Sequence, residues 1–375
     1  MAPEYNSLGR VALPAIDNHV IPGVIVAAGQ AGQVGLLEAF GQRQVEPEPA
    51  PATVETVYDL ASLTKAVVTS LLVMKGVEEG RWHLDRPLGD HLRMLKDRPE
   101  VTIRRVLSHA GGFPAHRKLY ESVLAKSELG DDRRASIINL AAAEPLAYEP
   151  GSRSIYSDLG FILLGALVEQ TMSERLDALA DRMLFRPLQL PSTGFVDLRS
   201  REPRAQFHGH AVAPTEHCPV RGRLILGEVH DLNAFAMGGI AGHAGLFGSM
   251  EDLLKISFAL CAAYHGRGVA GCAPLVAPEV LREFWQPAGI PGSTWRLGWD
   301  GPATQGSLAG TLISRRAVGH LSFTGCSLWI DPEQETCVIV LCNRIHPQVH
   351  DDPRFRALRP ALHDAALQAI GYQAR

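Results

Sequence analysis

Two apolar runs near the start of the chain are separated by a short polar turn. Residues 23–30 (GVIVAAGQ) and 34–42 (VGLLEAFGQ) flank a glycine-containing turn. Short apolar runs bounded by such turns are typical of paired strands. We therefore predict a β-hairpin here, followed by a Pro-rich connector (EPEPAPA).

The apolar spacing changes to a helical period after Asp59. In DLASLTKAVVTSLLVMKG the apolar positions form a wide stripe, which predicts a helix packed into a core and ending near Gly76 or Gly80. Further helical segments follow, broken by Pro and Gly: RASIINLAAAEPLAY, LGFILLGALVEQTM, ERLDALADRMLFRPL and SMEDLLKISFALCAAYHG. The last begins with Ser249 and Asp252 at capping positions.

The pattern returns to strands near the end of the chain. The run GHLSFTGCSLWIDPEQETCVIVLCNR predicts two strands joined at Asp331-Pro332-Glu333, and an amphipathic helix (RFRALRPALHDAALQAIG) closes the chain. Strands at both ends with helices between them predict an α/β (α+β) fold, in which one antiparallel sheet is built from the N- and C-terminal parts. We expect a single domain, 1–375, with an α/β lobe of about 1–75 plus 250–375 and an inserted helical lobe of about 76–249.

Composition places the protein in the ordinary globular class. The 375 residues are 46% hydrophobic and 20% charged, which is enough to bury a sizeable core. The net charge is -4, and there is no basic run or interleaved basic-aromatic stripe. We therefore expect no nucleic-acid partner.

The segment MAPEYNSLGR lacks the basic and apolar regions of a secretory signal, and no apolar run approaches membrane-spanning length. The expectation is a cytoplasmic protein without a membrane partner. The six cysteines include no C-x-x-C pair and lie mostly in apolar surroundings, which predicts reduced core thiols and no disulfides.

Ser62 and Lys65 lie one helical turn apart, so their side chains share a face. This spacing suggests a serine nucleophile with a lysine base. A lysine with its ordinary pKa near 10.4 is protonated at neutral pH, and lowering that pKa to about 7 requires roughly 4 to 5 kcal/mol. We expect burial at a helix N-terminus to lower it. The alternative is an exposed lysine beside an N-capping serine.

Two later segments bear on the same chemistry. Tyr156-Ser157-Asp158 precedes an apolar helix, so a phenol and a carboxylate project from a helix-entry loop. The alternative there is a helix cap, with Tyr156 packing as a hydrophobic staple. His320 begins a predicted strand, where a buried structural histidine is the alternative.

A metal site is a competing hypothesis. Metal-ligand residue types gather between FHGHAVAPTEHC and the AGHAGLF segment: His208, His210, His217, Cys218, His230, Asp231 and His243. Their spacing fits no H-E-x-x-H or paired C-x-x-C signature, so no metal is expected. His109 and His243 are expected to hold loops by hydrogen bonds, and His243 is also a candidate to line the cleft.

Taken together, these segments resemble the S-x-x-K, Y-x-N and K-T-G set of the penicillin-recognising serine hydrolases, which include class C β-lactamases, D-alanyl-D-alanine carboxypeptidases and related esterases. VYDLASLTK, VLSHAGGF, EPGSRSIYSDLGFILLG, GGIAGHAGLF and GHLSFTGCSLWIDP all look like stretches of class C-like members. The resemblance implies that fold, Ser62 as the acylated nucleophile, Lys65 as its proton acceptor and Tyr156 as the relay to the leaving group. Amide N–H groups of Ser62 and Phe323 would stabilise the oxyanion, without metal or cofactor.

The sequence departs from this family pattern at two positions. Asp158 stands where Asn is usual, and His320-Leu321-Ser322 replaces K-T-G, so an amide donor and a permanent cation are lost. The candidate substrate-binding residues are Asp158, His320, Phe323 and His243. We expect His320 to gain a proton just below neutral pH.

These departures favour small esters over β-lactams, so the expected partner is a small-molecule ester or amide substrate. D-alanyl-D-alanine carboxypeptidase, D-aminopeptidase or β-lactamase activity is the alternative, and a non-catalytic sensor module is a second one. The sequence does not indicate an oligomeric state.

Overall fold

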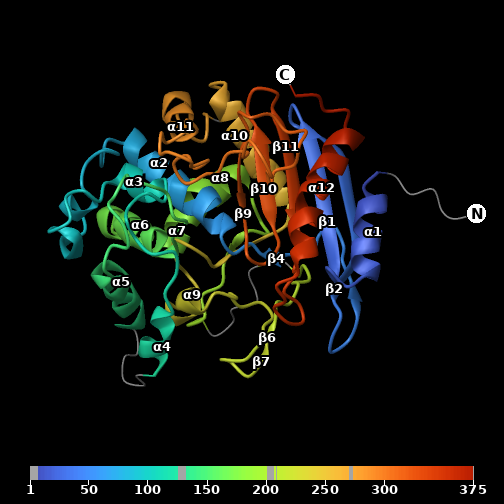
Figure 1. Cartoon of the computed structure of the whole chain (residues 1–375), viewed down its shortest axis with the longest axis horizontal. Coiled ribbons are helices and arrows are strands. Elements are labelled where there is room, and N and C mark those ends of the chain that lie inside the picture. Colours follow the sequence, from blue (N-terminus) through green and yellow to red (C-terminus); the bar gives the residue numbers. More distant parts are fainter. Residues whose placement is uncertain (1–6, 126–131, 201–206, 208, 270–272, 375) are drawn as a thin grey trace, which may run out of the picture.

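A six-stranded antiparallel sheet lies between two layers of helices, with α1 (Gly9–Asp17) and α12 (Pro353–Ala369) on its outer face in Figure 1. This computed structural model describes residues 7–125, 132–200, 207, 209–269 and 273–374. The strand order is β3-β2-β1-β11-β10-β9. The bounds are β1 (Gly23–Gln30), β2 (Gln33–Gln44), β3 (Ala50–Pro51), β9 (Val318–Leu321), β10 (Ser327–Asp331) and β11 (Thr336–Leu341). The predicted hairpin is confirmed as β1 and β2, and β1 pairs with β11, so both ends of the chain contribute to one sheet as predicted.

The C-terminal run contains one strand more than predicted. Residues 318–341 form β9, β10 and β11, because the short segment of β9 pairs with β10, with His320 opposite Leu328. The four residues of β9 are too few to show a clear alternation in the sequence.

Both faces of the sheet are covered by helices. In β1, Val24, Val26 and Ala28 pack in the cluster formed with α1 and α12. Ile25 and Ala27 point to the opposite face, where α10 (Met250–Tyr264) and the remaining helices lie. This two-sided burial explains the nearly continuous apolar sequence of the central strands. The predicted cap of α10 is confirmed, since the Ser249 hydroxyl accepts a hydrogen bond from the Asp252 amide.

The middle of the chain is mainly helical, as predicted, and lies beside the sheet in Figure 1. Its central element, α6 (Asp158–Met172), has ten consecutive buried residues and is therefore apolar on all sides, as a core helix is. The helices of this region are α2 (Leu71–Glu78), η2 (Leu88–Asp90), η3 (Arg93–Leu95), α3 (Ile103–Leu107), α4 (Leu119–Leu124), α5 (Arg133–Ala143), α6 (Asp158–Met172), α7 (Leu176–Ala180), η5 (Asp181–Phe185), α8 (Arg186–Leu188) and α9 (Leu232–Ala236), and α11 (Pro278–Phe284) follows α10.

The helix predicted after Asp59 forms in two parts. Its first part, η1 (Lys65–Ser70), is a π-helix, and α2 continues it to Glu78. The Ser70 hydroxyl donates to the Lys65 carbonyl oxygen at 2.7 Å inside the widened turn. Such π-segments are frequent at functional sites, and the apolar spacing does not distinguish them from an α-helix.

Two smaller sheets position the loops around Ser62. In the first, β8 (Leu246–Gly248) lies between β4 (Tyr58–Asp59) and β5 (Gly194–Phe195), so the residues before Ser62 run beside the end of the AGHAG loop. The second is the β6–β7 hairpin (His217–Cys218 and Arg223–Leu224).

Within the described ranges, no helix is long and apolar enough to cross a membrane. The five described cysteines are buried free thiols, and Cys272 lies outside the described residues.

Candidate active site

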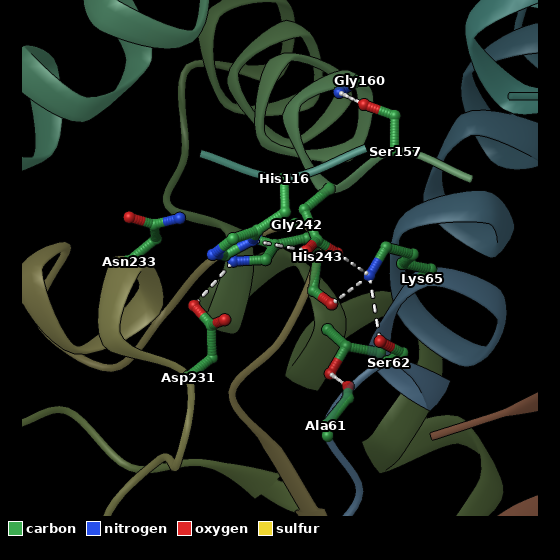
Figure 2. A network of polar contacts seen from close by, with 12 residues as sticks. Ala61, Ser62, Lys65, His116, Ser157, Gly160, Asp231, Asn233, Gly242 and His243 are labelled. Carbon is green, nitrogen blue, oxygen red and sulfur yellow. Dashed lines mark hydrogen bonds and ion pairs between the residues drawn. The ribbon is translucent and has the colours of Figure 1, made fainter. Parts of the chain in front are cut away.

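Ser62 and Lys65 meet at the start of η1, as their spacing predicted. The Lys65 ammonium donates to Ser62 Oγ over 3.1 Å, and the Lys65 side chain is fully buried (Figure 2). Ala61, the residue before the nucleophile candidate, has a positive φ of 44°. Its amide donates to Asp59 Oδ1 at 2.8 Å, and this bond holds the unusual turn in place.

Lys65 has two further partners. Its Nζ lies 2.8 Å from Asp158 Oδ1 and donates to the His243 carbonyl oxygen over 2.9 Å. Burial is the largest influence and acts to lower the pKa of Lys65, but Asp158 and Tyr156 together outweigh it and raise that pKa above its ordinary value. The expectation of a lowered lysine pKa is therefore wrong: the resting side chain is an ammonium ion.

Asp158 begins α6 directly after the N-cap residue Ser157, whose hydroxyl accepts from the Gly160 amide. Burial alone would raise the pKa of Asp158. The Lys65 charge and a 3.1 Å hydrogen bond from His116 Nδ1 outweigh it and hold that pKa well below its usual range. Asp158 is thus a carboxylate that binds Lys65 and His116. An asparagine at this position would lack the negative charge.

Tyr156 lies over the Lys65 ammonium, with its ring centroid 4.9 Å from Nζ. Its hydroxyl is buried and has no hydrogen-bond partner within the described part of the chain. The ring packs in an aromatic group, with centroid distances of 4.6 Å to His109 and 5.5 Å to Trp295. Burial raises the pKa of the Tyr156 phenol and outweighs the opposing Lys65 charge, so the hydroxyl keeps its proton at neutral pH.

His109 is the loop-holding residue that we expected. Its Nδ1 accepts the Ser157 amide at 3.0 Å, and its carbonyl oxygen accepts the Tyr148 hydroxyl at 2.7 Å. The histidine therefore fixes the entry to α6 from behind Tyr156.

His320 is buried in β9 behind Tyr156, at a ring distance of 5.9 Å. Its Nδ1 donates to the Leu321 carbonyl oxygen at 2.7 Å. Burial and the Lys65 charge lower the pKa of His320 to about 3. The expectation that His320 gains a proton just below neutral pH is therefore wrong, because the imidazole stays neutral at physiological pH.

His243 combines both of its expected roles. Its Nε2 donates to Asp231 Oδ1 at 2.8 Å, which fixes the loop as Figure 2 shows, and its ring also lines the cavity beside Ser62. Burial works to raise the pKa of Asp231, but the His243 contact lowers it to about 2. The loop is close-packed, because a side chain at Gly242 would overlap the Phe161 carbonyl of α6.

The turn after β9 presents Phe323, whose side chain is 47% exposed and stacks on His230 at 5.5 Å. The Thr324 hydroxyl donates to the Asp59 carbonyl oxygen at 2.8 Å and thereby joins this turn to the Ser62 turn. Among the described residues, neither the Ser62 amide nor the Phe323 amide donates to another protein group. Both N–H groups are therefore available to a ligand.

A cavity of about 410 Å³ opens beside Ser62. Larger hollows open elsewhere among the described residues, beside α7, beside α12 and beside the turn between β10 and β11, and none of these three contains Ser62, Lys65 or Tyr156. The lining residues are Ala61, Ser62, His116, Lys118, Tyr120, Tyr156, Asp158, Glu216, His230, Asp231, Leu232, His243, Ala244 and Phe323. Of the residues predicted for the site, Ser62, Tyr156, Asp158, His243 and Phe323 line this cavity. Lys65 and the predicted substrate-binding residue His320 do not belong to its lining.

The histidine-rich segment serves other contacts. In the described ranges, no group of three or more His, Cys, Asp or Glu side chains could hold a metal ion, and His208 lies outside those ranges. His230 instead pairs with Glu216, at 3.0 Å between Nε2 and Oε1.

Several residues of the site were not identified from the sequence. His116 and Trp295 lie in loops far from Tyr156 along the chain, and no motif marks them. The signal that could have pointed to His116 is its place three residues after the LSHAGGF segment, which the fold brings against α6.

The chain is similar to a known family of proteins. The family model for Beta-lactamase matches residues 10–363. Two relatives named "Putative D-alanyl-D-alanine carboxypeptidase" are similar to the chain. The one from Escherichia coli O157:H7 is 31% identical over 353 residues, covering 88% of this chain and 80% of the relative. The one from Escherichia coli strain K12 is 33% identical over 321 residues, covering 81% and 73%.

Solved structures share the fold. EstCE1, described as a hydrolase with promiscuous acyltransferase activity, superposes with a TM-score of 0.73 at 21% identity over 96% of this chain and 97% of its own. The octameric penicillin-binding protein homologue from Pyrococcus abyssi gives 0.70 at 22% identity over 98% and 77%. With the family match across nearly the whole chain, these findings show that this protein belongs to the Beta-lactamase family and is a serine hydrolase.

Proposed function

We propose that the protein hydrolyses small carboxylic esters through an acyl-enzyme on Ser62. The observation that carries this proposal is the 3.1 Å contact between Ser62 Oγ and Lys65 Nζ at one wall of the cavity. Ser62 Oγ attacks the ester carbonyl, and its proton passes to the neutral form of Lys65. Tyr156 gives its own proton to the departing alcohol and is reprotonated by Lys65, so the two side chains divide the proton transfer.

The oxyanion that forms in each step requires fixed donors. The free amides of Ser62 and Phe323 are candidates for this role, because they belong to two turns joined through Thr324 and Asp59. Water then cleaves the acyl-enzyme by the same route in reverse.

The charges of the site support an ester rather than a carboxylate-bearing substrate. His320 is neutral where the K-T-G pattern has a lysine, and Asp158 is negative where the Y-x-N pattern has an asparagine. Among the described residues that line the cavity, Lys118 is the single lysine or arginine, and its side chain is 66% exposed at the rim. A substrate carboxylate would find little to pair with deep in this cavity.

A second candidate function is D-alanyl-D-alanine carboxypeptidase activity. Lys118 at the rim favours it, since an exposed ammonium there could meet a terminal carboxylate. The names of the two relatives that are 31% and 33% identical point the same way.

The test is a panel of p-nitrophenyl esters, nitrocefin, penicillin G and a peptide ending in D-Ala-D-Ala, measured on the purified protein and on Ser62→Ala. We expect short-chain esters to be turned over fastest, and we expect Ser62→Ala to lose at least about a thousandfold in kcat. A fluorophosphonate should label Ser62 in the unmodified protein. Activity retained by Ser62→Ala would disprove the nucleophile assignment, and release of D-alanine faster than ester hydrolysis would favour the second candidate.

A further inference from the structure

Arg359 is a buried cation without an acidic partner. It lies on α12, is 7% exposed, and packs its guanidinium over the Phe355 ring at 4.8 Å. No carboxylate in the described part of the chain lies within ion-pair distance of it. Burial lowers the pKa of Arg359 to about 10, so the side chain remains charged at neutral pH. Burying an unpaired charge costs free energy, so its retention requires a reason.

The contact that Arg359 makes is to the turn that carries Phe323. Its Nη2 donates to the Ser322 carbonyl oxygen at 3.0 Å, in a buried hydrogen bond. That carbonyl belongs to the same peptide group as the Phe323 N–H. Because the peptide bond is conjugated, a charged donor on its oxygen withdraws electron density from its nitrogen and makes the N–H a stronger donor.

We infer that Arg359 is a positioning residue of the oxyanion site, which orients and polarises the Ser322–Phe323 peptide so that the Phe323 N–H binds the developing oxyanion more strongly. This inference rests on the proposed function, in which that N–H is one of the two oxyanion donors. The interaction acts mainly in the transition state, because the negative charge on the substrate oxygen appears there.

The same turn offers a matched control. Arg344 Nε donates to the Phe323 carbonyl oxygen, also at 3.0 Å. This oxygen belongs to the next peptide group, whose N–H is that of Thr324. Arg344 therefore holds the turn with the same type of side chain and bond length, and its guanidinium also lies 5.0 Å from the centroid of the Phe323 ring, but it does not bond to the carbonyl that shares a peptide group with the proposed oxyanion donor.

The experiment compares Arg359→Met and Arg344→Met with the unmodified enzyme in two measurements. The first is kcat and KM for a p-nitrophenyl ester. The second is the infrared carbonyl frequency of the acyl-enzyme formed from a slowly released ester labelled with 13C at the carbonyl. Loss of an entire oxyanion donor typically costs about 10²–10³ in kcat, so a weakened donor should cost about tenfold. Arg359→Met should therefore lower kcat about tenfold with little change in KM, and raise the carbonyl frequency.

Arg344→Met should leave the carbonyl frequency unchanged. If Arg359→Met does not fold, Arg359→Gln replaces it, since glutamine keeps an N–H donor but removes the charge, and the same changes should appear at smaller size. Wild-type kcat and carbonyl frequency in the folded Arg359 variant would overturn the inference, and so would an equal frequency shift in Arg344→Met. Absence of acylated Ser62 in the unmodified enzyme would instead overturn the proposed function on which the inference rests.

Discussion

The ion pair between Lys65 and Asp158 should control how the reaction depends on pH. The proposed mechanism needs neutral Lys65, but Asp158 raises the pKa of this lysine, so only a small fraction is neutral at pH 7. In the unmodified enzyme, kcat/KM for a neutral ester should therefore keep rising with pH and reach no plateau in the range where the protein stays folded. Asp158→Asn removes the charge that holds the proton on Lys65, and burial then favours the neutral amine.

The size of the effect follows from the 2.8 Å separation of Lys65 Nζ and Asp158 Oδ1. Two unit charges at that distance attract by about 6 kcal/mol at an effective dielectric constant of about 20. One pH unit corresponds to about 1.4 kcal/mol, so even a quarter of that attraction would move the profile by about one unit. The plateau of Asp158→Asn should thus appear at lower pH, by about one unit or more.

The assay is kcat/KM for a neutral p-nitrophenyl ester, corrected for spontaneous hydrolysis, at closely spaced pH values. The position of the rise is the decisive quantity, because the substitution can also change the maximal rate. Asp85→Asn is a matched control, since Asp85 forms an exposed ion pair with Arg104 at 2.7 Å. Superimposable profiles for Asp158→Asn and the unmodified enzyme would refute the reasoning.

Two further substitutions test separate features. Tyr156→Phe removes a buried hydroxyl that has no partner among the described residues, so the free energy of unfolding should change by less than about 1 kcal/mol. The value of kcat should fall about a hundredfold or more, because the proton donor to the departing alcohol is lost. A stable, fully active variant would exclude Tyr156 as that proton donor. Burial lowers the pKa of His363 to about 3 in the folded protein. Below about pH 6.5 the unfolded chain therefore binds a proton at this histidine that the folded protein does not bind, so the free energy of unfolding decreases as the pH falls. His363→Gln can still bond to the Ser327 hydroxyl. Its urea midpoint should fall less between pH 7 and pH 4 than that of the unmodified protein, and an equal fall in both proteins would show that His363 does not cause the loss of stability.

Local signals in the sequence were sufficient for much of the fold and part of the site. The spacing of Ser62 and Lys65 fixes their side chains on one face, and the turn closed by the Lys65 amide on the Ser62 carbonyl oxygen, just before the π-helix, brings them within 3.1 Å. The hairpin and α6 were likewise visible, because their patterns depend on neighbours along the chain.

Properties that depend on distances between remote atoms could not be predicted. The direction of the Lys65 pKa shift depends on how closely Asp158 approaches, since burial and charge act in opposite directions. His320 was expected to titrate because the sequence does not show that it lies behind Tyr156. Arg359 lies on a helix whose pattern shows its apolar face but not the carbonyl that the guanidinium reaches.

The pairing of β1 with β11 has a consequence for how the protein folds. Gln30, at the end of β1, bonds to Gln334, which lies 304 positions later in the chain. During synthesis the β1–β2 hairpin and the helices are complete long before β11 emerges, so one edge of β1 stays unpaired until almost the entire chain has been made. Contacts of such long sequence separation form slowly, and open strand edges promote aggregation. The central sheet should therefore be the last part of the molecule to close, and newly made chains should depend on protection of that edge.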